Sequence, residues 1–252
     1  MNAAELAQSI AEPLGAVGAT YYFDAGTIER GTAIGLDVLS FYALGRGGVL
    51  GDVPAEEVDD VFFFFRRGAI AELYGKGRAV GSAEVGAAAH LEAADAYARR
   101  TFGGVPVTTL RAFNDAAAAL TATAPTGQWP IFDGYRDRGL TGDPVADAYR
   151  NAILLRELRG GVHTDAVKDA GLTPAEACAT DHGGANFALH GFGDADRPEM
   201  TAELDARRAA AEADTNTRMA GLLATLDDVQ RGALKEGAIA MHDALAAPVP
   251  VG

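Results

Sequence analysis

Hydrophobic residues recur at helical spacing along most of the chain. In residues 144–158, Tyr149, Ala152, Ile153 and Arg156 fall at positions i, i+3, i+4 and i+7, which predicts a helix whose inward side includes an arginine. A buried guanidinium group needs a carboxylate or an anionic ligand as its partner, so a site is expected around this arginine. Similar spacing predicts further helices over residues 2–11, 27–44, 54–73, 82–101, 107–123, 198–226 and 228–245.

The expected fold is all-α, a multi-helix bundle of about ten helices. Residues 1–125 are predicted to form an N-terminal helical domain and residues 144–252 a C-terminal one, either separate or packed as one unit. An irregular connection is expected at residues 126–143, and a loose Ala-Pro-Val-Pro segment at residues 247–250. Short helices on both sides of residues 170–173 have helix-turn-helix spacing, but no clear wing follows them.

Charge excludes several classes of partner. The 252 residues include 21 Lys and Arg against 35 Asp and Glu, for a formal net charge of −14. Such a balance opposes non-specific binding to nucleic acid and docking on an anionic membrane. The N-terminus has no signal-peptide pattern, and no apolar run approaches the length of a membrane span. We therefore expect a soluble, cytoplasmic protein with no membrane partner.

The densest group of reactive side chains lies at residues 156–163. Arg156 and Arg159 could clamp an anion, and Glu157 or His163 could transfer a proton. On a helix Arg156 and Glu157 point about 100° apart, so no direct pair between them is expected. The glycines at 160–161 are expected to end the helix and let His163 fold back. The alternative is a buried ion-pair network that only fixes how the helix docks.

Aromatic residues supply a second part of the predicted site. Four consecutive phenylalanines at residues 62–65 cover more than one face of their predicted helix, so Phe62 and Phe65 either pack in the core or line an apolar cavity. Arg46 stands between glycines shortly after Tyr42, which makes both plausible pocket residues. The neighbouring glycine-rich loops follow helices and not strands, so they lack the context of a nucleotide-binding loop.

Metal binding is not predicted, and no cofactor is identified. His163, His182 and His190 could supply imidazole ligands, but their spacing fits no ligand signature. A single cysteine, Cys178, excludes an intrachain disulfide and a thiolate zinc site. We interpret this cysteine as a small buried hydrophobic residue.

One motif resembles a known family. Residues 154–160 (Leu-Leu-Arg-Glu-Leu-Arg-Gly), followed by His163, resemble the Leu-Leu-Arg-Glu-x-Arg-Gly-x-x-His segment of an uncharacterised actinobacterial family related to helix-turn-helix, winged-helix-like proteins. The resemblance implies a fold and a pocket, without a settled activity. Residues 194–213 depart from it, because they form a charged helical run where the family has a wing. Shorter stretches that agree in order lie at residues 22–23, 35–46, 58–65, 170–176 and 212–216.

Three functions remain as hypotheses. The first is a small-molecule-binding helical protein related to winged-helix regulators that has lost DNA binding. The second is a cytoplasmic enzyme that acts on an anionic or carbonyl-containing small molecule by general acid/base chemistry. The third is a transcriptional regulator. A homodimer is expected because the terminal helices carry a long apolar seam.

Overall fold

Helices make up the regular structure of this protein. The computed structural model describes residues 1–246, and within them it has twelve α-helices and no strands, which confirms the all-α prediction. The predicted loose segment at residues 247–250 lies outside the described residues. The helices are α1 (Ala3–Ala19), α2 (Ala25–Ala33), α3 (Val38–Gly47), α4 (Ala55–Val61), α5 (Ala69–Arg78), α6 (Ala83–Phe102), α7 (Val107–Thr123), α8 (Pro130–Asp137), α9 (Pro144–Asp169), α10 (Pro174–Thr180), α11 (Ala202–Leu223) and α12 (Asp228–Leu245), with short 3-10 turns at Thr20–Phe23, Gly48–Leu50, Asp181–Gly184 and Asp194–Asp196.

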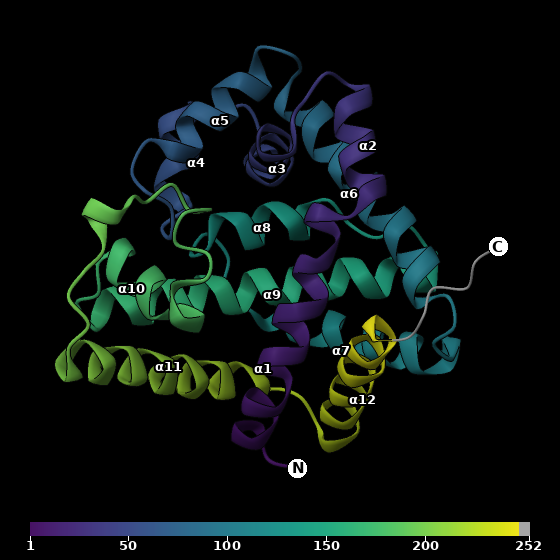
Figure 1. The fold of residues 1–252 in the computed structure, drawn as a ribbon. Coiled ribbons are helices and arrows are strands. Elements are labelled where there is room, and N and C mark those ends of the chain that lie inside the picture. The colour runs from purple at the N-terminus through teal and green to yellow at the C-terminus, as the bar shows by residue number, and fades with distance from the viewer. Residues whose placement is uncertain (247–252) are drawn as a thin grey trace.

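Helix α9 is the element around which the others pack. It crosses the middle of the molecule, with α8 on one side of it and α11 on the other, while α1 crosses over it (Figure 1). Helices α6 and α7 also contact α9. Tyr149, Ile153 and Leu158 of α9 are fully buried. Burial of this stripe holds the pocket-facing side chains of α9 in place.

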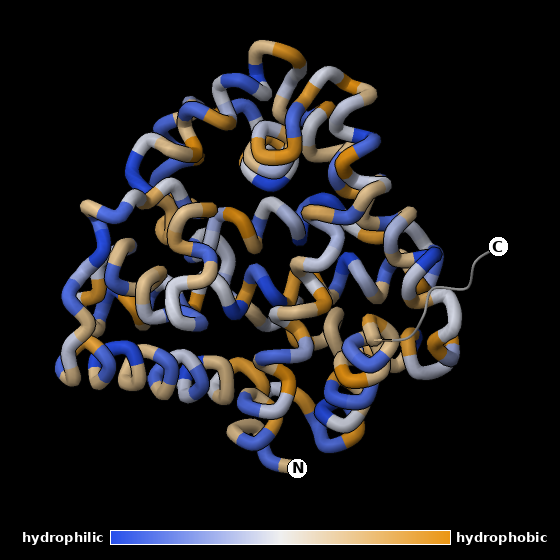
Figure 2. Tube along the Cα trace, in the orientation of Figure 1, coloured by the Kyte–Doolittle hydropathy of each residue, from blue (hydrophilic) through white to orange (hydrophobic). Residues whose placement is uncertain are grey.

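The two predicted halves share one hydrophobic core. Helix α1 packs against α9, α11 and α12, and α7 packs against α12. The largest buried cluster includes Leu6 near the N-terminus and Met241 near the C-terminal end of α12. Hydrophilic and hydrophobic positions alternate along the outer helices, as expected for helices with one buried side (Figure 2).

Two predicted helices are broken by a turn. The helix expected at 27–44 is divided into α2 and α3, with Gly35 at φ +84° and Asp37 capping α3 by accepting from the backbone N–H of Leu39 and Ser40. The helix expected at 54–73 ends at Val61, and α5 begins after Gly68 at φ +86°. Positive φ suits glycine, and the apolar spacing continues across both turns, so periodicity alone did not reveal them.

Two other expectations need correction. Residues 126–143 contain a helix, α8, which begins with Pro130 and buries Ile131, Phe132 and Tyr135. The helix predicted to end near Gly160 continues to Asp169, so His163 lies inside α9 and does not fold back over the glycines.

Within residues 1–246, no single helix is both long enough and apolar enough to cross a membrane. Only the pair Ala25–Ala33 and Val38–Leu50 reaches the necessary length and apolarity together, and its two segments meet at a bend of 86°.

Candidate functional site

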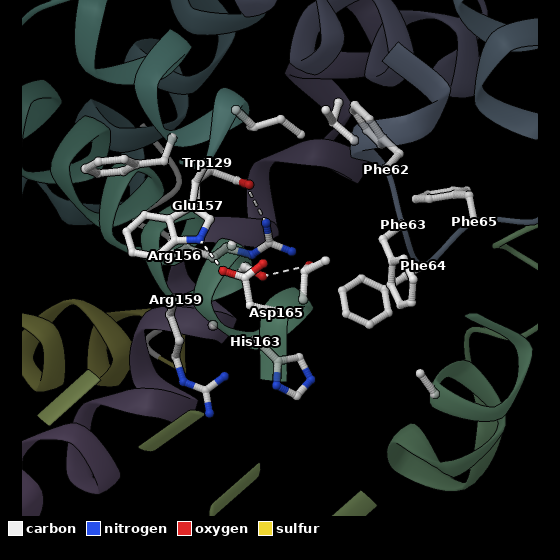
Figure 3. A pocket seen from close by; sticks show the side chains of 18 of the residues that line it. Phe62, Phe63, Phe64, Phe65, Trp129, Arg156, Glu157, Arg159, His163 and Asp165 are labelled. Atoms are coloured by element: carbon white, nitrogen blue, oxygen red, sulfur yellow. Dashed lines mark hydrogen bonds and ion pairs between the residues drawn. The ribbon is translucent and has the colours of Figure 1, made fainter. Parts of the chain in front are cut away.

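A pocket of about 580 Å³ lies beside the central helix, and we call it the α9 pocket. All eight residues predicted from the sequence to form a site line it, although they come from three parts of the chain. They are Tyr42 and Arg46 of α3, Phe62 and Phe65 of the α4–α5 connection, and Arg156, Glu157, Arg159 and His163 of α9. In Figure 3 the phenylalanines stand on one side of the pocket and the charged side chains of α9 stand across from them.

Helix α9 contains its two glycines without ending at them. It starts with Pro144 in its first turn, and the Asp143 side chain accepts a hydrogen bond from the backbone N–H of Val145. At Gly161 a Cβ atom would lie 2.5 Å from Cγ of Trp129, so glycine makes room for the indole. At Gly160 an added Cβ would meet no atom within 4 Å, and this position borders the pocket. Gly161 therefore makes room for the indole, Gly160 leaves open space beside the pocket, and neither glycine ends the helix.

Glu157 holds two arginines at the pocket wall. Its carboxylate accepts hydrogen bonds from Arg46 Nε at 3.1 Å and Arg46 Nη2 at 2.6 Å, the bidentate arrangement typical of arginine. Arg156 Nη1 donates to the same carboxylate at 2.8 Å, so the expectation that Arg156 and Glu157 do not pair is wrong. The flexible arginine side chain explains this: its stem lies beside Gly18, and its head turns towards Tyr22 and the carboxylate.

The Glu157 cluster carries one positive charge in excess, because two guanidinium groups share a single carboxylate. The Glu157 side chain is 3 % exposed, that of Arg46 14 % and that of Arg156 28 %. Burial alone would raise the pKa of Glu157, but the charges of Arg46 and Arg156 outweigh it and hold the pKa below its ordinary value. Glu157 is therefore an ionised partner for the arginines at neutral pH.

A second polar group surrounds His163. Its Nδ1 lies 2.9 Å from the hydroxyl of Thr215, and its ring stacks on Phe64 with centroids 5.7 Å apart. Burial lowers the pKa of His163 to about 4, with further lowering by the nearby positive charge of Arg208, so the imidazole is neutral at pH 7. Arg159 pairs with Glu212 of α11 and not with the carboxylate of Glu157.

The phenylalanine side of the pocket is a turn and not a helix. Tyr42 meets the rings of Phe62 and Phe65 at centroid distances of 6.1 Å each, and its hydroxyl accepts a hydrogen bond from Arg46 at 2.9 Å. The Arg46 guanidinium also lies 4.7 Å from the centroid of the Phe62 ring, a cation–π distance. An apolar surface thus adjoins the Glu157 cluster directly.

Sequence reasoning missed several pocket residues. Trp129 lines the pocket, and its Nε1 donates to Asp165 at 2.9 Å. Cys178 is buried as expected, but it also lines the pocket, and its Sγ lies 3.1 Å from His190 Nδ1. Burial raises the pKa of the Cys178 thiol to about 12. Trp129 and Asp165 are 36 positions apart, and the segment between Cys178 and His190 is irregular. Residue spacing therefore could not predict either contact.

No cluster with metal-binding composition occurs in the described part of the chain. Within residues 1–246, no three His, Cys, Asp or Glu side chains gather in a way that could hold an ion. His163 and His190 both line the pocket, and each already hydrogen-bonds to a side chain of the protein, Thr215 and Cys178 respectively. His182 also borders the pocket and is largely exposed.

The expected helix-turn-helix consists of the end of α9, the turn at residues 170–173, and α10. Gly171 has φ +71°, and Thr173 caps α10 reciprocally with Glu176. Helix α10 carries no Lys or Arg, and its Glu176 pairs with Arg207 of α11 at 2.8 Å. The one charged side chain of α10 is therefore engaged in an ion pair within the protein.

Comparison with known proteins matches this chain to the model of a family, but to no curated protein and no solved structure. Residues 7–191, from α1 to the loop after α10, match the model of a family described as a helix-turn-helix family. This range includes all eight predicted site residues and excludes α11 and α12. Because the match covers more than half of its length, the chain belongs to this helix-turn-helix family.

Proposed function

We propose that this protein binds a small organic molecule in the α9 pocket. The observation that carries the proposal is the Glu157 cluster, which sets a local excess of positive charge beside an aromatic surface in a cavity of about 580 Å³ whose whole lining has five basic and five acidic side chains. Cavities of this size that combine apolar surface with convergent polar groups are typical of ligand sites. The open space over Gly160 adds support, because glycine inside a helix costs about 1 kcal/mol relative to alanine and no neighbouring atom requires it there.

Loss of DNA binding is part of this proposal. Membership of a helix-turn-helix family relates the chain to regulator-like helical proteins. A recognition helix, however, needs side chains that reach phosphates and base edges. Helix α10 has seven residues, its only charged side chain is Glu176, and none of its residues is more than partly exposed. The formal net charge of −14 opposes DNA binding further.

Catalysis is the second candidate, and it would depend on His163. Glu157 is a poor proton carrier, since both of its oxygens accept hydrogen bonds from arginine. His163 is neutral, lines the pocket and is held by Thr215 and Phe64, so it could accept a proton from a bound substrate. Turnover that His163→Gln abolishes while ligand affinity persists would favour this function.

Native mass spectrometry of freshly purified protein tests the proposal directly. We expect a retained small molecule, or one taken up from a metabolite library, in the unmodified chain. Gly160→Leu places a side chain in the open space of the pocket and should abolish the bound mass. Gly232→Leu is the matched control, because Gly232 also lies inside a helix with no atom within 4 Å but outside the pocket. Equal occupancy in both variants would contradict a ligand in the α9 pocket.

A gel-shift experiment distinguishes transcriptional regulation from the other two functions. Low salt is the most permissive condition, because electrostatic attraction to DNA is strongest there, and even then we expect no shifted band with genomic fragments. A shift that high salt removes would restore transcriptional regulation as the function.

A further inference from the structure

Three residues of α9 define a line along the pocket. Arg156, Gly160 and His163 stand at positions i, i+4 and i+7, so they share one face of the helix, and all three border the pocket. At a rise of 1.5 Å per residue, the first and last are about 10 Å apart along the helix axis. Gly160 lies between them and leaves the backbone uncovered, because a Cβ there would meet no atom within 4 Å. The polar ends of this line are thus separated by open space.

The Arg156 end offers hydrogen-bond donors. Both hydrogen bonds of this guanidinium use Nη1, to Glu157 at 2.8 Å and to the hydroxyl of Tyr22 at 3.4 Å. Within residues 1–246, Nε and Nη2 of Arg156 have no hydrogen-bond partner in the protein. Since Glu157 already serves Arg46 as well, the group best suited to the remaining donors is a carboxylate brought by a ligand.

The His163 end offers an acceptor, and its tautomer follows from the hydrogen bonds. Thr215 Oγ1 lies 2.7 Å from the carbonyl oxygen of Ala211, which can only accept, so the hydroxyl proton goes there. The contact of 2.9 Å between Thr215 Oγ1 and His163 Nδ1 then requires that Nδ1 carries the proton and donates. In the neutral ring, Nε2 therefore has a free lone pair, and it has no hydrogen-bond partner within residues 1–246.

Packing keeps this imidazole in one orientation. The ring lies nearly parallel to Phe64, at 18°, on one side and is tied to the fully buried Thr215 on the other. Phe64 is itself held edge-on by Phe63 at 5.3 Å. A ring flip would break the bond to Thr215, so Nε2 is presented to the pocket as a fixed acceptor.

We propose that the ligand is an aromatic carboxylic acid with a hydroxyl group at its far end. Its carboxylate binds Arg156, its ring lies over Gly160 against the phenylalanine side of the pocket, and its hydroxyl donates to His163 Nε2. This inference rests on the proposed function, because it names the ligand class of the same pocket.

Matched probes test each end of the ligand separately. We would titrate the protein calorimetrically with 4-hydroxybenzoate, 4-hydroxyphenylacetate and 4-hydroxycinnamate, which differ in length. Each is compared with the acid that lacks the hydroxyl and with the carboxamide of the hydroxy compound. For at least one length, loss of the hydroxyl should weaken binding about 5-fold, and loss of the carboxylate charge about 10-fold or more.

Variants assign these losses to residues. His163→Phe keeps a ring to stack on Phe64 and should make acids with and without the hydroxyl bind equally. Arg156→Gln should weaken the acids towards the affinity of the carboxamides while leaving the carboxamides unchanged. Circular dichroism would verify that both variants are folded.

The outcomes separate this inference from the proposed function. If no hydroxy acid binds more tightly than both of its counterparts, the inference is wrong. If native mass spectrometry still finds a molecule that Gly160→Leu expels, the proposed function stands without it. If neither the probes nor any library compound binds, both fail.

Discussion

Replacing Glu157 with glutamine tests whether this carboxylate holds the pocket wall together. Glutamine has nearly the same shape, but it removes the charge and turns an amide group towards Arg46, whose Nη2 now lies 2.6 Å from the carboxylate. Two guanidinium groups would then face each other without a counter-charge. Breaking a buried ion pair by removing one partner costs about 3–5 kcal/mol.

Exposure of the arginines sets the expected loss within that range. The side chain of Arg156 is 28 % exposed and that of Arg46 is 14 % exposed, so water can partly solvate both after the change. We therefore expect a loss near the lower end, about 3 kcal/mol, out of a total stability of roughly 5–15 kcal/mol. For a chain of this length, such a loss corresponds to a fall in the unfolding midpoint of about 6–12 °C.

Urea and thermal unfolding followed by far-ultraviolet circular dichroism would measure this loss. Glu84→Gln is the matched control, because Glu84 also pairs with an arginine, Arg138, at 2.6 Å but is 72 % exposed. Its effect should stay below about 1 kcal/mol. If Glu157→Gln lowered the midpoint no more than Glu84→Gln, the Glu157 cluster would contribute no more than an exposed ion pair and the reasoning from burial would be refuted.

Gly160, the buried histidines and Cys178 each allow a further test. Gly160→Ala should raise stability by about 0.5–1 kcal/mol, as should its control Gly232→Ala, because neither Cβ meets an atom within 4 Å. A lower thermal unfolding midpoint for Gly160→Ala alone would contradict an open position at residue 160. Burial lowers the pKa of His90 to about 3 and that of His163 to about 4, from 6.5 in both cases. As pH falls, the unfolded chain therefore binds protons first, and the free energy of unfolding in urea titrations should decrease from pH 6.5 to 4, whereas a flat profile would argue against buried neutral imidazoles. Since burial raises the pKa of Cys178 to about 12, its alkylation by iodoacetamide at pH 8 should be at least about 100-fold slower in the native state than in urea; equal rates would mean an exposed thiolate.

Helix positions were largely predictable, and the errors have a common cause. Periodicity and caps identified α6, α7 and α12 with nearly correct ends. The glycines at 160–161 were misread as a helix end because sequence shows only that glycine permits a turn. The reason for Gly161 is the indole of Trp129, 32 positions earlier, and no local pattern reveals such a contact.

The site shows what residue type can and cannot predict. A phenylalanine run, an isolated arginine between glycines and an Arg-Glu-x-Arg segment were each unusual enough to single out, and all of them line the α9 pocket. Their pairing was not predictable: Glu157 finds Arg46 across 111 positions, and Arg159 finds Glu212 on a helix outside the family match. Whether the eight residues bind a ligand stays a prediction, as does the homodimer.

The unbroken course of α9 constrains any movement that a bound molecule could cause. At 26 residues the helix is about 39 Å long, and its first turns are anchored in the core while its last turns carry the helix-turn-helix. The core and the helix-turn-helix share this one continuous helix, so any motion that a bound molecule caused in the turn before α10 would have to move α9 and the helices that pack against it.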